Sequence, residues 1–292
     1  MSIKYPLKLS RYNLHFGLPA PLKVLHISDS HLLEANEFDS PLKRELTDLR
    51  IYSFEHELQR NEPGAIESYF AAIAEYARQN AALVVHTGDL IDFICAGSLA
   101  RMKKAFAELP MLFTPGNHEY MTEIWPKYRE SENPLAWEDV KKILPIESEF
   151  YAEIHGGVNF IFVDNANYQF TERQLQRFNE EAERGLPIIL LCHVQIHTPE
   201  NYANYFSPSH PCAYTVGCPV DLMNDYPEEL RIQQAPDKAT KAFIDGIKKC
   251  PELRAVWCGH HHLPFESELF PGVMQRAVGG SYLGYVNEYI ID

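Results

Sequence analysis

The chain has 292 residues and a mass of 33.5 kDa, about twice the usual length of a domain, which excludes a mini-protein and permits one large domain or two small ones. Hydrophobic residues make up 46% of it and aromatic residues 12%, which favours a folded globular protein over a disordered one. Its 26 basic and 40 acidic side chains give a formal net charge of −14, and no run of basic residues is present, so long nucleic acids and anionic membrane surfaces are disfavoured as partners.

No stretch approaches the roughly 18 to 20 uninterrupted apolar residues of a membrane span, and residues 1–6 lack the apolar core of a signal peptide. We therefore expect a soluble, cytoplasmic protein with no membrane partner. The six cysteines form no C-x-x-C pair, which favours reduced thiols, and a single bridge between Cys212 and Cys218 is the alternative.

Apolar residues alternate with polar residues or proline from Ile3 to Leu9 and again from Tyr12 to Phe16, which predicts a hairpin of two half-buried strands. Short apolar runs predict further strands at 24–28, 83–87, 111–114, 158–163, 188–192, 255–258, 273–278 and 285–291. Apolar positions three and four residues apart predict helices at 64–80, 171–184 and 237–249. This alternation predicts a layered α/β domain with helices flanking the sheets.

Three segments interrupt this rhythm, at 32–62, 120–137 and 197–236. The mixed Glu and Lys residues of 42–60 are typical of a solvated helix face. The segment 197–236 is too long for an ordinary connection and is therefore either a functional lid or a disordered insert. No shift in composition marks a boundary, so we interpret residues 1–292 as a single domain with these insertions.

Side chains that can bind a metal follow five of the predicted strands, each at the carboxyl end. In chain order they are Asp29 and His31, Asp89, Asn117, His193, and His260 with His262. Ligands of open α/β sheets bind beyond the carboxyl ends of the strands, so we expect these side chains to converge. Residues i and i+2 of an extended segment point the same way, so the first two and the last two are each expected to present a pair of donors to one cavity.

Carboxylates and neutral imidazoles suit divalent ions such as Mn, Fe, Zn or Co better than they suit Ca or Mg. Seven ligands are too many for one tetrahedral site, so we expect two divalent transition-metal ions. Glycine precedes Asp89, Asn117 and His260, which fits sharp turns with a backbone close to the ions.

The ordered set D-x-H, G-D, G-N-H-E, H and G-H-x-H, from Asp29 to His262, resembles the pattern of the calcineurin-like metallophosphoesterase superfamily. The resemblance implies a four-layer α-β-β-α sandwich of two facing mixed β-sheets. It also implies one metal on Asp29, His31 and His262, a second metal on Asn117, His193 and His260, and Asp89 as the bridge between them. His118 would contact the phosphoryl oxygen or protonate the leaving alkoxide.

General chemistry supports these roles. Two cations roughly 4 Å apart coordinate a bridging hydroxide at neutral pH and clamp the phosphoryl oxygens during in-line attack, and an imidazolium beside them protonates the leaving group. We therefore expect a metal-dependent phosphoester hydrolase assisted by His118. Glu119 is a candidate for orienting a ring nitrogen, on adjacency alone.

Other histidines and tyrosines have simpler interpretations. His26 and His86 lie inside apolar strands and are expected to be hydrogen-bonded core residues. His197, Tyr202 and Tyr205 are candidate substrate contacts, since tyrosine rings stack on bases and on aromatic leaving groups. The alternative is that the rings of 197–236 form a small core within the insert.

Departures from the subfamilies narrow the substrate. Ser/Thr protein phosphatases carry G-D-x-x-D-R-G and G-N-H-E-x-R, whereas Phe93 and Met121 stand at those arginine positions here. Purple acid phosphatases carry a tyrosine where this chain has Asp92, and the acidic charge disfavours the DNA-repair nucleases of the superfamily.

The pattern is closer to the bacterial phosphodiesterase branch, including class III cyclic-nucleotide phosphodiesterases. We therefore expect a small soluble phosphoester as the substrate, a diester before a monoester. The alternatives are a phosphomonoesterase or nucleotidase that uses the same site, and a catalytically silent binding scaffold.

Overall fold

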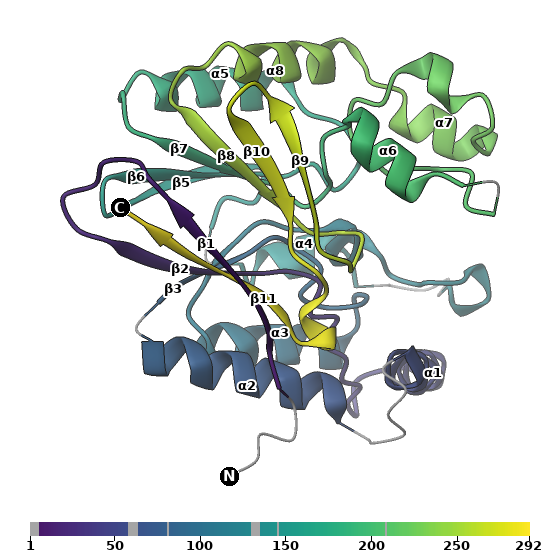
Figure 1. Ribbon diagram of the computed structural model, residues 1–292. Coiled ribbons are helices and arrows are strands. Elements are labelled where there is room, and N and C mark those ends of the chain that lie inside the picture. The colour runs from purple at the N-terminus through teal and green to yellow at the C-terminus, as the bar shows by residue number, and fades with distance from the viewer. Residues whose placement is uncertain (1–5, 58–63, 81, 130–134, 145, 208) are drawn as a thin grey trace.

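The computed structural model describes residues 6–57, 64–80, 82–129, 135–144, 146–207 and 209–292. In these ranges the chain forms two mixed β-sheets and eight α-helices (Figure 1). None of the helices there is long and apolar enough to cross a membrane.

The first sheet has five strands in the order β1-β11-β2-β3-β4. Their bounds are Lys8–Leu14 for β1, Leu22–Ile27 for β2, Leu83–His86 for β3, Leu112–Phe113 for β4 and Tyr285–Ile291 for β11. Strands β2, β3 and β4 run parallel, whereas β11 is antiparallel to β2 and parallel to β1.

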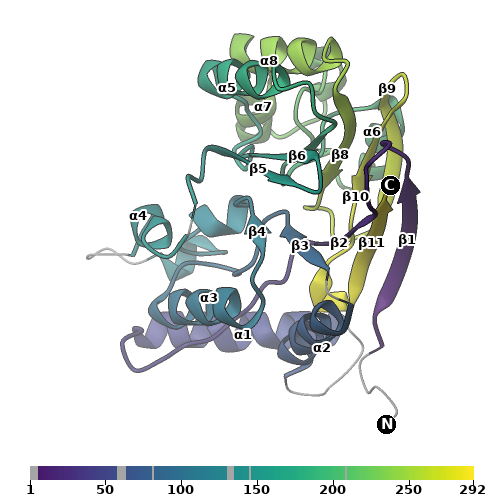
Figure 2. The same cartoon turned by 90° about the vertical axis from the view of Figure 1, so that its left-hand side faces the viewer.

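The hairpin predicted at the N-terminus is wrong. Leu9 and Tyr12 belong to one strand, β1, and β11 lies between β1 and β2 (Figure 2). The alternation correctly predicted a half-buried face, since Leu9, Tyr12 and Leu14 are partly buried, but burial of a face does not identify the pairing partner, which here comes from the far end of the sequence. Ile3 and Tyr5 lie outside the described residues.

The second sheet has six strands in the order β5-β6-β7-β8-β10-β9. Their bounds are Phe150–His155 for β5, Val158–Val163 for β6, Ile188–Leu191 for β7, Leu253–Cys258 for β8, Phe265–Phe270 for β9 and Val273–Ala277 for β10. The four central strands are parallel, and β5 and β9 are antiparallel edges. The strands expected from 24–28 onward are confirmed, whereas the two edge strands were not predicted.

Helices cover the outer face of each sheet, so the predicted four-layer sandwich is confirmed (Figures 1 and 2). Helices α2 and α3 lie against the first sheet, and α5 and α8 against the second. Their bounds are Ala65–Asn80 for α2, Ala96–Glu108 for α3, Glu172–Ala182 for α5, capped by Thr171, and Lys238–Lys248 for α8. Alternation along β2 explains the layering, because Leu25 packs with the helices and Val24 packs with Trp257 of the facing sheet.

Three of the remaining helices lie in the inserted segments. They are α1 at Pro41–Glu57, α6 at Pro199–Tyr205 and α7 at Glu228–Gln234, whereas α4, at Trp137–Lys141, begins where the 120–137 segment ends. Apart from position 208, the 197–236 insert is described throughout, and it packs around a core of its own that includes buried Met223 and Tyr226. Cys212 and Cys218 lie in that core as free thiols, so the alternative bridge between them is not formed.

His26 and His86 are core residues, as predicted. His26 stacks on Trp257 and bonds to Thr87 Oγ1 at 2.8 Å, and His86 bonds to Ser30 Oγ at 2.9 Å. Burial lowers the pKa of both histidines to about 3, so both rings are neutral at physiological pH.

Candidate metal centre

The seven side chains predicted as metal ligands come together beyond the carboxyl ends of β2, β3, β4, β7 and β8. Six of them form two groups whose ligand atoms lie within 4.8 Å of one another, and Asp89 belongs to both groups. The seventh, Asn117, contacts the second group through His193.

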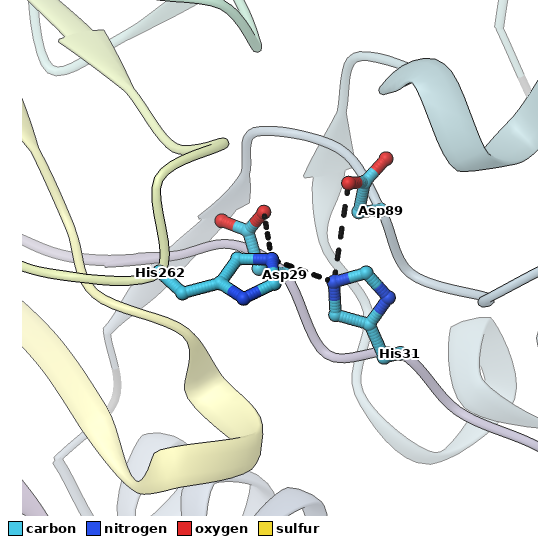
Figure 3. A group of neighbouring side chains, drawn as sticks. All are labelled: Asp29, His31, Asp89 and His262. Atoms are coloured by element: carbon cyan, nitrogen blue, oxygen red, sulfur yellow. Dashed lines mark hydrogen bonds and ion pairs between the residues drawn. The ribbon is translucent and has the colours of Figure 1, made fainter. Parts of the chain in front are cut away.

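The first group consists of Asp29, His31, Asp89 and His262, which point toward one another from three loops (Figure 3). His31 Nε2 lies 3.0 Å from His262 Nε2 and 3.9 Å from Asp89 Oδ2. His262 Nε2 lies 3.5 Å from Asp29 Oδ1. Two imidazoles and two carboxylates therefore face one small volume.

The second group consists of Asp89, His193 and His260. His193 Nε2 lies 3.2 Å from Asp89 Oδ2, 3.1 Å from His260 Nδ1 and 3.1 Å from Asn117 Oδ1. The division into two groups that share Asp89 matches the division that the family resemblance implied.

The backbone of the ligand loops differs from the extended form that we used to argue their convergence. Asp29, His31, Asp89, His260 and His262 all have left-handed φ values, between 45° and 78°. In the described residues only two other non-glycine positions have positive φ, Tyr168 and Tyr214. The paired side chains converge because the loops turn sharply at each ligand, and such strain, on the order of 1–3 kcal/mol per residue, concentrates at functional sites.

All three glycines that directly precede candidate ligands lie too close to other atoms to carry a side chain. A Cβ on Gly88 would collide with the backbone of Gly116, one on Gly116 with the carboxylate of Asp89, and one on Gly259 with Ser28 Oγ. This agrees with the prediction of a backbone close to the ligands.

Hydrogen bonds on the outer ring nitrogens set which atom of each histidine faces the centre. His193 Nδ1 donates to the carbonyl of Thr87 at 2.7 Å, and His31 Nδ1 donates to Asp92 Oδ1 at 2.9 Å. In the neutral rings both Nε2 atoms then carry lone pairs that face Asp89. Lone pairs opposite a carboxylate repel one another unless a cation or a proton lies between them, so this donor set fits divalent metal ions.

Electrostatics of the metal-free centre show the same need for positive charge. Burial raises the pKa of Asp29. Burial would also raise the pKa of Asp89, but His193 and His118 hold it well below its ordinary value. Burial lowers the pKa of His193, but the Asp89 carboxylate outweighs this and raises it to about 10. A proton on His193 therefore stands where a metal would bind.

His118 lies beside the first group and belongs to neither of the two groups that share Asp89. Its backbone N–H donates to Asp89 Oδ1 at 2.9 Å, and its Nδ1 donates to the carbonyl of Asp92 at 2.5 Å. Its Nε2 is 4.0 Å from Asp89 Oδ2 and so is the ring atom on the side of the ligands. Burial lowers the pKa of His118, but the charges of Asp89 and Asp92 outweigh burial and raise it.

Asp92 and Arg50 also support the centre, and neither was predicted to do so. The Asp92 carboxylate is fully buried and accepts from His31, while Arg50 forms a bidentate pair with it. Asp92 could have been found from its spacing in G-D-x-x-D. Arg50 carries no local signal, because it lies 42 positions earlier, in an inserted helix.

Glu119 was a candidate for orienting a histidine ring nitrogen because it follows His118 in the sequence, but in the structure it binds backbone N–H groups. Its carboxylate accepts hydrogen bonds from the backbone N–H groups of Asp89, Leu90 and Gly116, at 2.9, 2.8 and 2.7 Å, and within the described part of the chain it makes no hydrogen bond to an imidazole. It therefore ties together the loops that carry Asp89 and Asn117. Burial, assisted by the charge of Asp89, raises its pKa to about 7.

The three candidate substrate contacts lie in the 197–236 insert. Tyr202 and Tyr205 pack on the core of the insert, and the ring of His197 meets Tyr202 edge-on at 5.8 Å. Tyr205 reaches furthest toward the centre, because its ring stacks on His261, between the two ligand histidines, at 3.5 Å. This arrangement favours the interpretation of the rings as a core.

Comparisons with known proteins agree with this geometry. Residues 22–264 match the family model described as calcineurin-like phosphoesterase. A search of curated protein sequences gives no significant match.

Solved structures resemble the chain over most of its length. A dimetal phosphatase from Danio rerio has a TM-score of 0.51 at 11% identity, with 91% of each chain covered. The calcineurin-like phosphoesterase YfkN from Bacillus subtilis has a TM-score of 0.44 at 12% identity, covering 91% of this chain and 83% of its own. A putative 5'-nucleotidase from Staphylococcus aureus has a TM-score of 0.43 at 11% identity, covering 90% of this chain and 49% of its own. At such identities, the first likeness supports the fold alone.

Proposed function

Since the chain belongs to the calcineurin-like phosphoesterase family, an enzyme family, we propose that it is a metal-dependent hydrolase of a small soluble phosphoester, a diester in preference to a monoester. The observation that carries this proposal is the pair of ligand groups that share the Asp89 carboxylate. A carboxylate shared between two nitrogen-rich groups is suited to a two-metal centre.

In this proposal each group holds one divalent ion. The first ion is held by Asp29, His31 and His262, the second by Asn117, His193 and His260, and Asp89 bridges them. Mn, Fe or Zn fits the mixture of imidazole and carboxylate donors. When bound, such a pair supplies Lewis-acid stabilisation of the phosphoryl oxygens and lowers the pKa of water.

His118 is the proposed catalytic residue, and its proton-donating atom is Nε2. The Nδ1 atom is already engaged by the carbonyl of Asp92, which fixes the ring and leaves Nε2 on the side of the ligands. In the metal-free protein the charges of Asp89 and Asp92 raise the pKa of His118, and the imidazolium is the form that would donate a proton to a leaving alkoxide.

The preference for a diester rests on the shortage of arginine at the centre. A phosphomonoester carries about −2 and demands more positive charge than a diester, which carries about −1. Arg50 reaches this region, but its Nε and Nη2 donate to Asp92. A phosphomonoesterase or nucleotidase that uses the same ligands is the alternative. A catalytically silent scaffold is disfavoured, because all seven ligands and His118 are present.

The test is hydrolysis by the Mn-loaded protein of bis-p-nitrophenyl phosphate and of p-nitrophenyl phosphate. We expect turnover of both, with the higher kcat/KM for the diester, and about two metal ions per chain by elemental analysis. Preference for the monoester would refute the diester assignment. Absence of turnover together with far fewer than two ions, not restored by added Mn, would favour the scaffold.

A further inference from the structure

Helix α1 brings an arginine to the support of the metal centre, although the helix belongs to an inserted segment. Arg50 Nε lies 2.6 Å from Asp92 Oδ2, and Arg50 Nη2 lies 2.9 Å from Asp92 Oδ1. The Asp92 side chain is fully buried, and 16% of the Arg50 side chain is exposed. Bidentate pairs of this kind fix the plane of the carboxylate as well as its position.

Aromatic rings hold the arginine in turn. The guanidinium carbon of Arg50 lies 4.6 Å from the ring centre of Phe54 and 5.8 Å from that of Trp125. Phe54 also packs on His31, with ring centres 4.9 Å apart. The arginine is therefore fixed by stacking as well as by its pair, and its stacking partner touches a metal-ligand candidate directly.

Asp92 contacts two imidazoles. Its Oδ1 atom, which accepts from Arg50, also accepts from His31 Nδ1 at 2.9 Å and lies 3.4 Å from His118 Nδ1. The His118 Nδ1–H is donated to the backbone carbonyl of Asp92, so the carboxylate itself orients the ring of His31 and lies beside that of His118. The same three residues, His31, Asp92 and His118, form a group that could hold a cation, but the arginine and the His31 N–H already donate to the carboxylate.

We propose that Arg50 is a positioning residue that fixes the carboxylate of Asp92 and, through it, the ring of His31, while the backbone carbonyl of the same aspartate holds His118. Its effect on turnover rests on the proposed function, whereas its effect on metal binding does not. Lysine at this position would keep the charge but could not hold both carboxylate oxygens in one plane.

The test compares Arg50→Lys and Arg50→Met with Arg44→Met, an exposed arginine of the same helix, as the matched control. Circular dichroism checks the fold, and titration with Mn²⁺ alone and with Zn²⁺ alone measures affinity. Histidine-¹⁵N NMR of the Zn-loaded protein reports the Nδ1–H of His31. We expect Arg50→Lys to lower affinity at the first group by about 10- to 100-fold and to shift the His31 signal, with affinity at the second group retained.

For turnover of bis-p-nitrophenyl phosphate, we expect Arg50→Lys to lower kcat with little change in KM. Arg50→Met leaves the buried Asp92 carboxylate without its partner. If this variant fails to fold, the measurements on Arg50→Lys decide the proposal. A folded Arg50→Lys with wild-type metal affinity and an unchanged His31 signal would overturn the proposal. A wild-type protein that binds metal but hydrolyses nothing would refute the proposed function and leave the metal and NMR measurements to decide the role of Arg50.

Discussion

Tyr168 offers a sharp test of how the second ion is held. Its ring is buried, its backbone has a left-handed φ of 63°, and its hydroxyl lies 3.1 Å from His260 Nε2. A metal bound through His260 Nδ1 would leave the ring proton on Nε2, and the Tyr168 hydroxyl would then accept from Nε2–H and hold that tautomer. Replacing Tyr168 by Phe removes this hydrogen bond and keeps the ring.

The magnitude follows from the loss of one neutral hydrogen bond. Such a bond contributes about 0.5–1.5 kcal/mol net, which corresponds to about a 2- to 12-fold loss of affinity at 1.4 kcal/mol per tenfold. The edge-on contact between the two rings, with centres 5.6 Å apart, is retained. The backbone strain is the same for both residues, so the free energy of unfolding of the metal-free protein should fall by no more than the value of that one hydrogen bond, about 0.5–1.5 kcal/mol.

Competition between the protein and a chelating dye for Zn²⁺ resolves the two binding steps. We expect Tyr168→Phe to weaken one step and leave the other unchanged. Tyr214→Phe is the matched control, because its ring also faces His260, with centres 6.3 Å apart, and its φ is 48°. Unchanged affinity at both steps, or an equal loss at both, would refute this account of His260.

Further predictions concern the proton donor, the bridge and the effect of pH. His118→Asn should keep the metal content near normal and slow turnover by about 10²- to 10⁴-fold, most for poor leaving groups. Asp89→Asn should lose metal and activity together. Elemental analysis and kinetics of both variants test this, and loss of metal from His118→Asn would contradict the role given to His118. The pKa of His193 is raised from 6.5 to about 10 by Asp89, so at pH 7 the metal-free ring is protonated and Zn²⁺ binding should release a proton, measurable by calorimetry in buffers of different ionisation enthalpy. Because the pKa of His193 is raised on folding, the His193–Asp89 pair stabilises the metal-free fold below about pH 6.5, and this stabilisation is lost as the pH rises through about 10. A melting temperature of the metal-free protein that rises between pH 6.5 and 10 would contradict this prediction.

Much of the fold could be predicted because its strands are short, apolar and buried on both faces. Parallel strands such as β7 read as continuous apolar runs, and ligand side chains directly after them mark the carboxyl edge of the sheet. The edge strands β5 and β9 were missed because their exposed faces dilute the pattern. The N-terminal pairing was missed because hydrophobic alternation carries no information on which distant strand lies alongside.

The same limit explains what was missed at the site. The candidate ligands follow their strands directly, so local sequence marks them. Asp92, Tyr168 and Arg50 act by orienting imidazoles, and each reaches its partner through tertiary packing between segments distant in sequence. Glu119 was linked to a ring nitrogen on adjacency, yet it binds backbone N–H groups of another loop. Asp92 is marked by its spacing in G-D-x-x-D, whereas the roles of Arg50, Tyr168 and Glu119 become visible only in three dimensions.

The position of β11 inside the first sheet, between β1 and β2, bears on when the centre can be assembled during synthesis. Every candidate ligand precedes β11 in the sequence, yet the backbone just before that strand holds two ligand loops, with Ser281 N donating to the carbonyl of Ser28 and Gly280 N donating to that of His262. Pairing of β11 with β1 also joins Lys8 to Tyr285, across almost the whole chain. When all the ligand residues of a nascent chain have emerged from the ribosome, the chain still lacks the strand that fixes them. We therefore expect metal to bind after translation is complete. Chains that end before residue 280 should stay metal-free and be exposed to degradation.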